Sequence, residues 1–299
     1  KKINTMSFYI NCAQDVKNTG VKDLCQDLGP IAGYMLCPYN FEDTESNARL
    51  YATYEAAVSA EKDARIYPFP PALGMTDNSE ETVYQDFALG RLFVKDGKTI
   101  LQFQHQSSRY KHEALKSHTG RKCSVVFYDQ QGRMHGVVGS TASMFKAVNL
   151  SELTVEKIKM NDGSGQGTHT VVSMTFENPN EWETKPAVLA GLTWNPSSLQ
   201  GLVDVELSLV TGSASTAGVT INAVGAKSGY PFNGSMGDFV IKNAAGVTQT
   251  ISAVTSEDGN NVLTATMVAG TYTANLADPA DMVTKGFESI GSVEFTVPV

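Results

Sequence analysis

The stretch VDVELSLV, residues 203 to 210, alternates apolar and polar side chains along most of its length. Positions 203, 205, 207 and 209 are apolar, whereas positions 204, 206 and 208 are polar. Successive side chains of a β-strand point to opposite faces of the sheet, so a period of two indicates a strand with one buried face. The stretch therefore predicts a β-sheet in this part of the chain.

The residues that follow repeat this pattern in short runs separated by turn residues. Ala245 and Gly246, and then Asp258 and Gly259, are residue pairs that tight turns favour. Seven short strands within about 100 residues are typical of an immunoglobulin-like β-sandwich. The predicted strands are 203–210, 218–225, 238–243, 248–255, 261–268, 270–276 and 292–299.

The run GTYTANL, residues 270 to 276, resembles the segment of immunoglobulin-like domains in which a tyrosine bonds back to an upstream turn. Tyr272 holds that position here. Because no cysteine and tryptophan pair of the antibody type is present, the resemblance is to the immunoglobulin-like modules of bacteria and phages. The composition also shifts after NPNEWETKP, residues 178 to 186, so we expect a first domain over 1–190 and the immunoglobulin-like domain over 191–299.

Three hairpins and one helix are predicted in the first domain. Asp96 and Gly97 separate two β-rich runs, and this turn predicts Leu92 opposite Leu101 and Phe93 opposite Ile100. A short helix follows, with Ser107 or Ser108 as N-cap and Gly120 as its stop. The second hairpin turns at Asp129 to Gly132 and places Cys123, Val125 and Phe127 on one face. Together these elements predict a β-sandwich or barrel flanked by a short helix.

The third hairpin is predicted in KIKMNDGSGQGTHTVVSM, residues 157 to 174, with Ile158 opposite Val172 and Met160 opposite Thr170. A phosphate-binding loop would end in Gly-Lys-Ser or Gly-Lys-Thr and enter a helix, and a calcium loop would carry several carboxylates. The glycine-rich tip meets neither requirement, so we expect it to become ordered against another subunit. This predicted inter-subunit loop comprises Asn161, Asp162, Gly163, Ser164, Gly165, Gln166, Gly167, Thr168 and His169.

Residues 44 to 62 fit two patterns equally well. Leu50, Tyr54 and Val58 have the spacing of a helix face that would begin at Thr44, yet apolar residues also alternate from 48 to 58 as in a strand. The sequence leaves both readings open.

The sequence carries no catalytic signature, and we expect no enzyme, no metal and no cofactor. Ser143 and Lys146 match a Ser-x-x-Lys spacing, but the companion elements of that enzyme class are missing. Glu80 and Glu81 lie in a polar stretch with no apolar pocket to raise a carboxyl pKa. The histidines, none in a helical metal-binding pair, are better explained as exposed or hydrogen-bonded structural residues, and they stand at positions 105, 112, 118, 135 and 169.

The charge and the apolar runs argue against several classes of partner. The formal net charge is −8, with three lysines against nine acids from residue 187 onward, and no basic cluster that would grip nucleic acid. No apolar run reaches the length of a membrane span, so we expect no association with a membrane. Polar residues interrupt any signal peptide near the start, so we expect no export by that route. The cysteines at 12, 25, 37 and 123 have no zinc-site spacing and are expected to be reduced and buried.

The order hairpin, helix, hairpin, hairpin and immunoglobulin-like module, with the tip NDGSGQGTH, resembles the tail tube proteins of tailed bacteriophages. The resemblance covers roughly residues 85 to 299 and includes no fixed residue motif. It implies a virion protein, assembled in the host cytoplasm, whose copies form hexameric rings that stack into a tube with the immunoglobulin-like module outside. It also implies contacts with other virion proteins, and DNA only as non-specific cargo in the lumen.

The first 85 residues exceed what a minimal tube subunit needs. A capsid, head-to-tail connector or decoration protein of a virion could contain the same elements, and so could a carbohydrate-binding or adhesive surface protein. These alternatives stay open at the level of the sequence.

Overall fold

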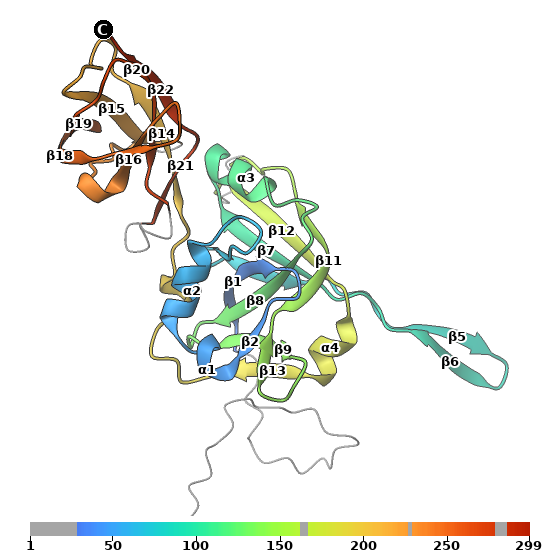
Figure 1. Ribbon diagram of the computed structural model, residues 1–299. Helices are drawn as coiled ribbons and strands as arrows, with labels where there is room; N and C mark the ends of the chain where they lie inside the picture. Colours follow the sequence, from blue (N-terminus) through green and yellow to red (C-terminus); the bar gives the residue numbers. More distant parts are fainter. Residues whose placement is uncertain (1–28, 162–166, 227–228, 279–285) are drawn as a thin grey trace, which may run out of the picture. The chain divides into compact units, whose positions relative to one another are not determined.

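The computed structural model describes residues 29–161, 167–226, 229–278 and 286–299 (Figure 1). The chain divides into two compact units, Lys1–Gln200 and Gly201–Val299, and each is described by itself. Strands account for 48% of the chain and helices for 12%, which confirms the predicted mainly-β fold.

The first unit is built on one branched sheet. Its main path runs β2-β10-β9-β8-β11-β12-β7-β4, while β1 pairs with β8 and β3, and β13 pairs with β9. A separate hairpin is formed by β5 (Val83–Phe87) and β6 (Gly90–Lys95). The strands of the branched sheet are β1 (Ile31–Pro38), β2 (Glu42–Thr44), β3 (Tyr67–Pro68), β4 (Gly74–Asp77), β7 (Ile100–Gln106), β8 (Cys123–Asp129), β9 (Met134–Val138), β10 (Met144–Lys146), β11 (Val148–Val155), β12 (His169–Phe176) and β13 (Pro186–Leu189).

Strand β8 lies at the centre of this unit and is buried along its whole length. As predicted, Cys123, Val125 and Phe127 share one face, where they join the hydrophobic core cluster with residues of β7, β11 and β12. Cys37 and Cys123 are buried free thiols, as expected, whereas Cys12 and Cys25 lie outside the described residues. The turn from Asp129 to Gly132 is also confirmed, because the amide of Gly132 donates to the carbonyl of Asp129 at 3.1 Å.

Short helices accompany the sheet. The undecided segment 44–62 is helical, with α1 (Glu45–Ala48) capped by the Thr44 hydroxyl and α2 (Tyr51–Val58) burying Tyr54 and Val58. The predicted helix is present as α3 (Arg109–Lys116), capped by Ser108. The helices α4 (Pro179–Thr184) and η1 (Pro196–Ser198) follow later in the unit.

The predicted hairpin around Asp96 and Gly97 is wrong. Strand β6 pairs with β5, which places Leu92 opposite Gln85 and Phe93 opposite Tyr84. Strand β7 instead lies between β12 and β4, so Leu101 is opposite Met174. The physical reason is burial, because this pairing brings Leu101 and Phe103 into the core, which a local two-stranded ladder could not do.

The third hairpin forms, but its predicted register is also wrong. Val172 lies opposite Val155 rather than Ile158, a shift of three residues. Thr170 pairs with His105 of β7, and Met160 is 56% exposed. The register follows the apolar residues of β11, since Leu153 and Val155 pack with Val172 in the core cluster.

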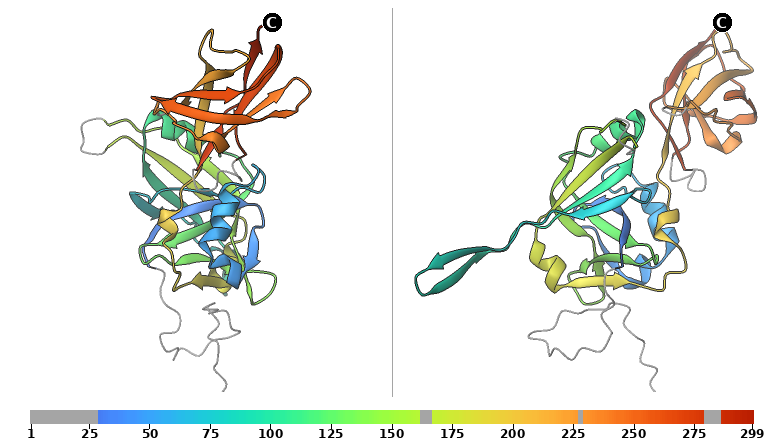
Figure 2. Two further views of the ribbon diagram at one scale, coloured as in Figure 1. Left: turned by 60° about the vertical axis from the view of Figure 1, so that its left-hand side comes forward. Right: turned by 180° about the vertical axis from the view of Figure 1, so that it is seen from behind.

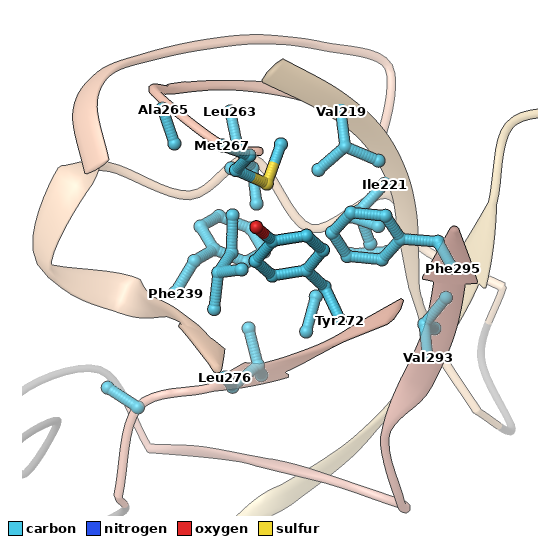
Figure 3. Packing of buried hydrophobic residues seen from close by; sticks show 14 of the residues in the cluster. Val219, Ile221, Phe239, Leu263, Ala265, Met267, Tyr272, Leu276, Val293 and Phe295 are labelled. Atoms are coloured by element: carbon cyan, nitrogen blue, oxygen red, sulfur yellow. The ribbon is translucent and has the colours of Figure 1, made fainter. Parts of the chain in front are cut away.

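The second unit is a sandwich of two sheets, in the orders β18-β19-β15-β14-β21 and β17-β16-β20-β22. Their inner side chains form one core, in which Tyr272 stacks on Phe295 (Figure 3). The predicted tyrosine contact is confirmed, because the Tyr272 hydroxyl donates to the carbonyl of Val268 at 2.9 Å. The elements are β14 (Val203–Leu209), β15 (Gly218–Gly225), η2 (Met236–Asp238), β16 (Phe239–Asn243), β17 (Thr248–Gln249), β18 (Ile251–Glu257), β19 (Asn260–Ala265), β20 (Gly270–Leu276), β21 (Phe287–Ser289) and β22 (Val293–Val297).

The turn between β18 and β19 has the geometry expected of its sequence. Asp258 and Gly259 form a two-residue loop, with φ of 48° and 81°. Positive φ at both positions belongs to the hairpin turns whose twist matches that of the flanking strands. The strands on either side were therefore predictable from local residues alone.

Candidate functional site

The hairpin β5–β6 projects from the body of the first unit as an arm, in two views that agree (Figures 1 and 2). We define the arm as residues 83–95. Within the described residues its strands pair only with each other, because β5 and β6 form a sheet of their own. An isolated two-stranded hairpin is marginally stable in water at best, so the arm is the part of this unit that most needs a partner.

The neck, residues 78–82 and 96–99, joins the arm to the body. The amide of Asn78 donates to the carbonyl of Ile100 at 2.9 Å, and the amide of Glu80 donates to the carbonyl of Lys98 at 2.9 Å. These bonds extend the β4–β7 ladder outward. The neck therefore directs the arm away from the body along the line of these two strands.

Large apolar side chains are exposed along both strands of the arm and at its tip. Leu89 at the tip is fully exposed, and the others are between 40% and 57% exposed. Monomeric proteins rarely leave so many large apolar groups together in water. The exposed residues are Val83, Tyr84, Phe87, Leu89, Leu92, Phe93 and Val94.

The predicted inter-subunit loop is only partly described. Asp162, Gly163, Ser164, Gly165 and Gln166 lie outside the described residues.

At the base of that loop, Lys159 and His169 exchange two backbone hydrogen bonds of 2.9 and 3.0 Å. The amide of Asn161 donates to the Thr168 hydroxyl at 3.3 Å, and His169 Nδ1 donates to the Gly167 carbonyl at 2.9 Å. His169 is buried at the start of β12, so this residue belongs to the strand rather than to the tip.

The other histidines pack or form hydrogen bonds within the first unit, although His112 and His118 are only partly buried. His105 Nε2 lies 2.9 Å from the Tyr34 hydroxyl, and His112 Nδ1 lies 3.0 Å from the Thr170 hydroxyl. His118 packs edge-on against Tyr67 at 4.8 Å between ring centroids. Burial lowers the pKa of His105 and of His118 to about 4, so both rings are neutral at pH 7.

A buried charged cluster lies at the turn between β8 and β9. Asp129 Oδ2 accepts hydrogen bonds from Arg133 Nε at 2.6 Å and from His135 Nε2 at 3.0 Å. Burial raises the pKa of Asp129, but the hydrogen bonds from Arg133 and His135 outweigh it and hold the pKa below its ordinary value. Because Oδ1 also accepts the amides of Gln131 and Arg133, the carboxylate is fully engaged in holding the turn together.

Ser143, Lys146 and Glu80, the residues considered for catalysis, lie in strands or take part in structural contacts. Ser143 directly precedes β10 and Lys146 ends it, so they lie on an extended segment, and the Lys146 ammonium pairs with Glu181 at 3.2 Å. Glu80 accepts the amide of Lys98 in the neck. Among the described residues no group of three or more His, Cys, Asp or Glu side chains could hold a metal ion. In the part of the chain that the structure describes, no helix has the length and apolar composition needed to span a bilayer.

The sequence did not predict the arm as a functional element. The sequence instead predicts that Leu92 and Phe93 pair with the strand that follows the Asp96–Gly97 turn. The signal that could have revealed the arm is the run TVYQDFALGRLFVK, residues 82 to 95, in which Gly90 follows a short turn between two β-rich segments. No protein-family model matches this chain, and no curated protein has a matching sequence.

Proposed function

We propose that this chain is a structural virion protein whose copies assemble into stacked rings, six copies to a ring, to form a phage tail tube with the immunoglobulin-like module on the outside. The observation that carries the proposal is the arm, with its exposed apolar side chains on a hairpin that pairs with nothing else in the described residues. An exposed apolar surface of this kind usually marks a site where another protein chain binds.

The energetics favour assembly through many arms at once. Full burial of a large apolar side chain stabilises by about 1.5–3 kcal/mol; six of the seven arm side chains are already about half covered, and Leu89 is fully exposed. The seven together therefore offer roughly 6–12 kcal/mol, which is comparable to the cost of about 4–15 kcal/mol for fixing two proteins together. A single arm gives a weak contact, and a closed ring in which every arm is buried gives a stable one.

The charge of the chain supports the tube role in particular. The formal net charge is −8, and like charge keeps a wall from holding the phosphates of DNA that slides past it. The alternatives are another virion protein, such as a capsid, connector or decoration protein, and a carbohydrate-binding or adhesive surface protein. A virion protein of another kind would also bury the arm but would not form open-ended tubes.

Removal of the arm tests the proposal. We expect that replacing residues 81–97 with an Asn-Gly turn leaves both units folded and yields a monomer by light scattering, whereas the full chain forms assemblies. A matched control changes Leu50 to Ala, at a residue that is 53% exposed and lies outside the arm, and this variant should assemble. Full-size assemblies without the arm, or a full chain that stays monomeric at high concentration and binds glycans, would contradict the proposal.

A further inference from the structure

We propose that two adjoining hollows of the first unit form a binding site for an uncharged saccharide, a ligand rich in hydroxyl groups whose sugar rings also have apolar C–H faces. The inference goes beyond the tube role and does not depend on it. It rests on the side chains that line the hollows, on the bonds that hold the polar groups in place, and on the charges that the described lining lacks.

The larger hollow lies where β1 and β4 begin and has a volume of about 490 Å³. This volume falls within the range of roughly 300–1,000 Å³ that is typical of small-molecule sites. A smaller hollow of about 200 Å³ adjoins it, since Gln130 and Asn195 line both. Because both hollows are partly open to solvent, together they offer a groove, which suits a ligand made of linked units.

Amide and hydroxyl side chains supply the polar part of the lining. The side chains of Gln130, Gln131 and Ser197 make no hydrogen bond to the described residues. Asn195 Oδ1 accepts the amide of Ser197 at 3.0 Å, which leaves Asn195 Nδ2 as a donor with no partner in the described part of the chain. A side-chain amide offers both donors and acceptors, and a sugar hydroxyl does the same, so these groups match each other.

The lining offers no counter-charge to an ionic ligand. Among the described residues no lysine, arginine or histidine lines either hollow, so an anionic group would lose its hydration without gaining a partner. Asp129 does line the larger hollow, but its Oδ2 already accepts bonds from the side chains of Arg133 and His135. Its Oδ1 accepts two backbone amides. A cation would have to displace these bonds, so the site favours an uncharged ligand.

The bonds of Asp129 also fix the turn that carries Gln130. The amide of Gly132 donates to the carbonyl of Asp129 at 3.1 Å, and the amide of Gln130 donates to the carbonyl of Pro30 at 3.3 Å. A binding group whose backbone is held in place beforehand loses less conformational entropy when the ligand arrives. The buried charged cluster at Asp129 therefore has a positioning role in the proposed site.

Apolar side chains supply the rest of the lining. Leu73 and Met75 line the larger hollow and are 63% and 38% exposed. Trp194 lines the smaller hollow, where its Nε1 donates to the carbonyl of Arg49 at 2.9 Å and so fixes the ring. Aliphatic and aromatic surfaces of this kind remove the C–H faces of a sugar ring from water. The lining thus matches both the hydroxyl groups and the apolar faces of a saccharide.

A glycan array tests whether the full chain binds such a ligand. The array carries neutral chains of hexoses and N-acetylhexosamines, together with acidic chains that contain sialic or uronic acids. We expect the full chain to bind at least one neutral chain, and the matching free disaccharide to compete for the same site. Failure to bind any neutral chain, or binding to acidic chains alone, would overturn the inference.

Two variants locate the site. Asn195→Asp keeps the Oδ1 that caps η1 and replaces the Nδ2 donor with an acceptor, and Gln130→Ala removes an exposed amide. We expect each to weaken binding of the selected neutral glycan about 3- to 10-fold, the effect of losing one neutral hydrogen bond. Asn222→Ala, which removes a surface amide of the second unit, is the matched control and should bind like the unmodified chain.

The unfolding temperature of each variant shows whether its fold is retained, and Gln130→Ala decides the case if Asn195→Asp is destabilised. Binding that is unchanged in Gln130→Ala, or weakened equally in Asn222→Ala, would place the saccharide elsewhere and overturn the inference.

Discussion

Asn261 is the buried polar residue on which the sandwich unit most depends. Its side-chain amide donates to the carbonyls of Ile221, Phe232 and Gly259, at 3.4, 3.0 and 2.7 Å. Its side-chain oxygen accepts the amide of Gly234 at 2.8 Å. One residue thus ties β15, the start of β19 and the loop that holds Phe232 to each other.

We predict that Asn261→Leu lowers the free energy of unfolding of the second unit by at least about 3 kcal/mol, because several buried groups each lose a partner at about 1–3 kcal/mol. Denaturant unfolding measures the change. Asn222→Ala is the matched control, since Asn222 also makes an amide hydrogen bond, to Asn260, but on the exposed surface. Equal losses for the two variants would contradict the role assigned to Asn261.

His105 links the stability of the first unit to pH. Its side chain is fully buried, and burial lowers its pKa from 6.5 to about 4. The unfolded chain then binds a proton that the folded chain does not, so stability is fully present above about pH 6.5 and falls as the pH drops toward 4. At about 1.4 kcal/mol per pKa unit, His105 contributes up to roughly 3 kcal/mol to this loss.

We predict that thermal unfolding of the first unit shifts to lower temperature between pH 7 and pH 4.5, and that His105→Gln reduces this dependence without abolishing it, because His118 keeps its own lowered pKa. His112→Gln is the control, because the His112 side chain is only partly buried. An unchanged pH profile in His105→Gln would show that His105 is not the group responsible.

At the scale of elements, the neck determines where the arm points. A Cβ atom at Gly97 would lie 1.9 Å from the backbone carbonyl oxygen of Glu80. The two strands of the neck approach each other too closely for any side chain at that position.

We predict that Gly97→Val opens the neck, so that proteases cut residues 78–99 faster, while the unfolding temperature of the first unit changes little. Gly74→Ala serves as the control, because a Cβ atom there meets nothing within 4 Å. Protection of the neck in Gly97→Val equal to that in the unmodified chain would contradict the close approach.

The two Asp-Gly pairs show how far the sequence predicts these elements. Asp258 and Gly259 form the expected hairpin turn, because β19 has one buried face, β18 packs Ile251 and Val254 against the same core, and the two strands are neighbours in sequence. Asp96 and Gly97 do not, because β7 gains more by pairing with β12, about 70 residues later. Local patterns thus predicted most of the sandwich strands, but they missed β21, and the predicted strand 248–255 is divided between β17 and β18 of different sheets. They did not predict the distant strand pairings of the first unit.

The same limit applies to the candidate site. The apolar residues of the arm have the composition of a core strand, and the sequence of one chain does not indicate whether a core or another copy covers them. Only the position of the arm outside the branched sheet shows that the core of this chain does not cover these residues.

At the scale of the whole molecule, the proposed assembly would be opposed by charge repulsion and driven by apolar burial. Each copy carries a formal net charge of −8, so copies repel one another at low ionic strength. We predict that raising NaCl from about 0.05 to about 0.5 M increases the assembled fraction in sedimentation velocity, because the screening length shortens. Dissociation on adding salt would instead indicate contacts dominated by ion pairs.

The central claim is that copies of this chain build a tube through their arms. Electron microscopy of the purified full chain tests it most directly. The account predicts stacked rings or hollow tubes, absent when residues 81–97 are replaced by a short turn. Single particles of monomer size at high protein concentration, or tubes that persist without the arm, would contradict it.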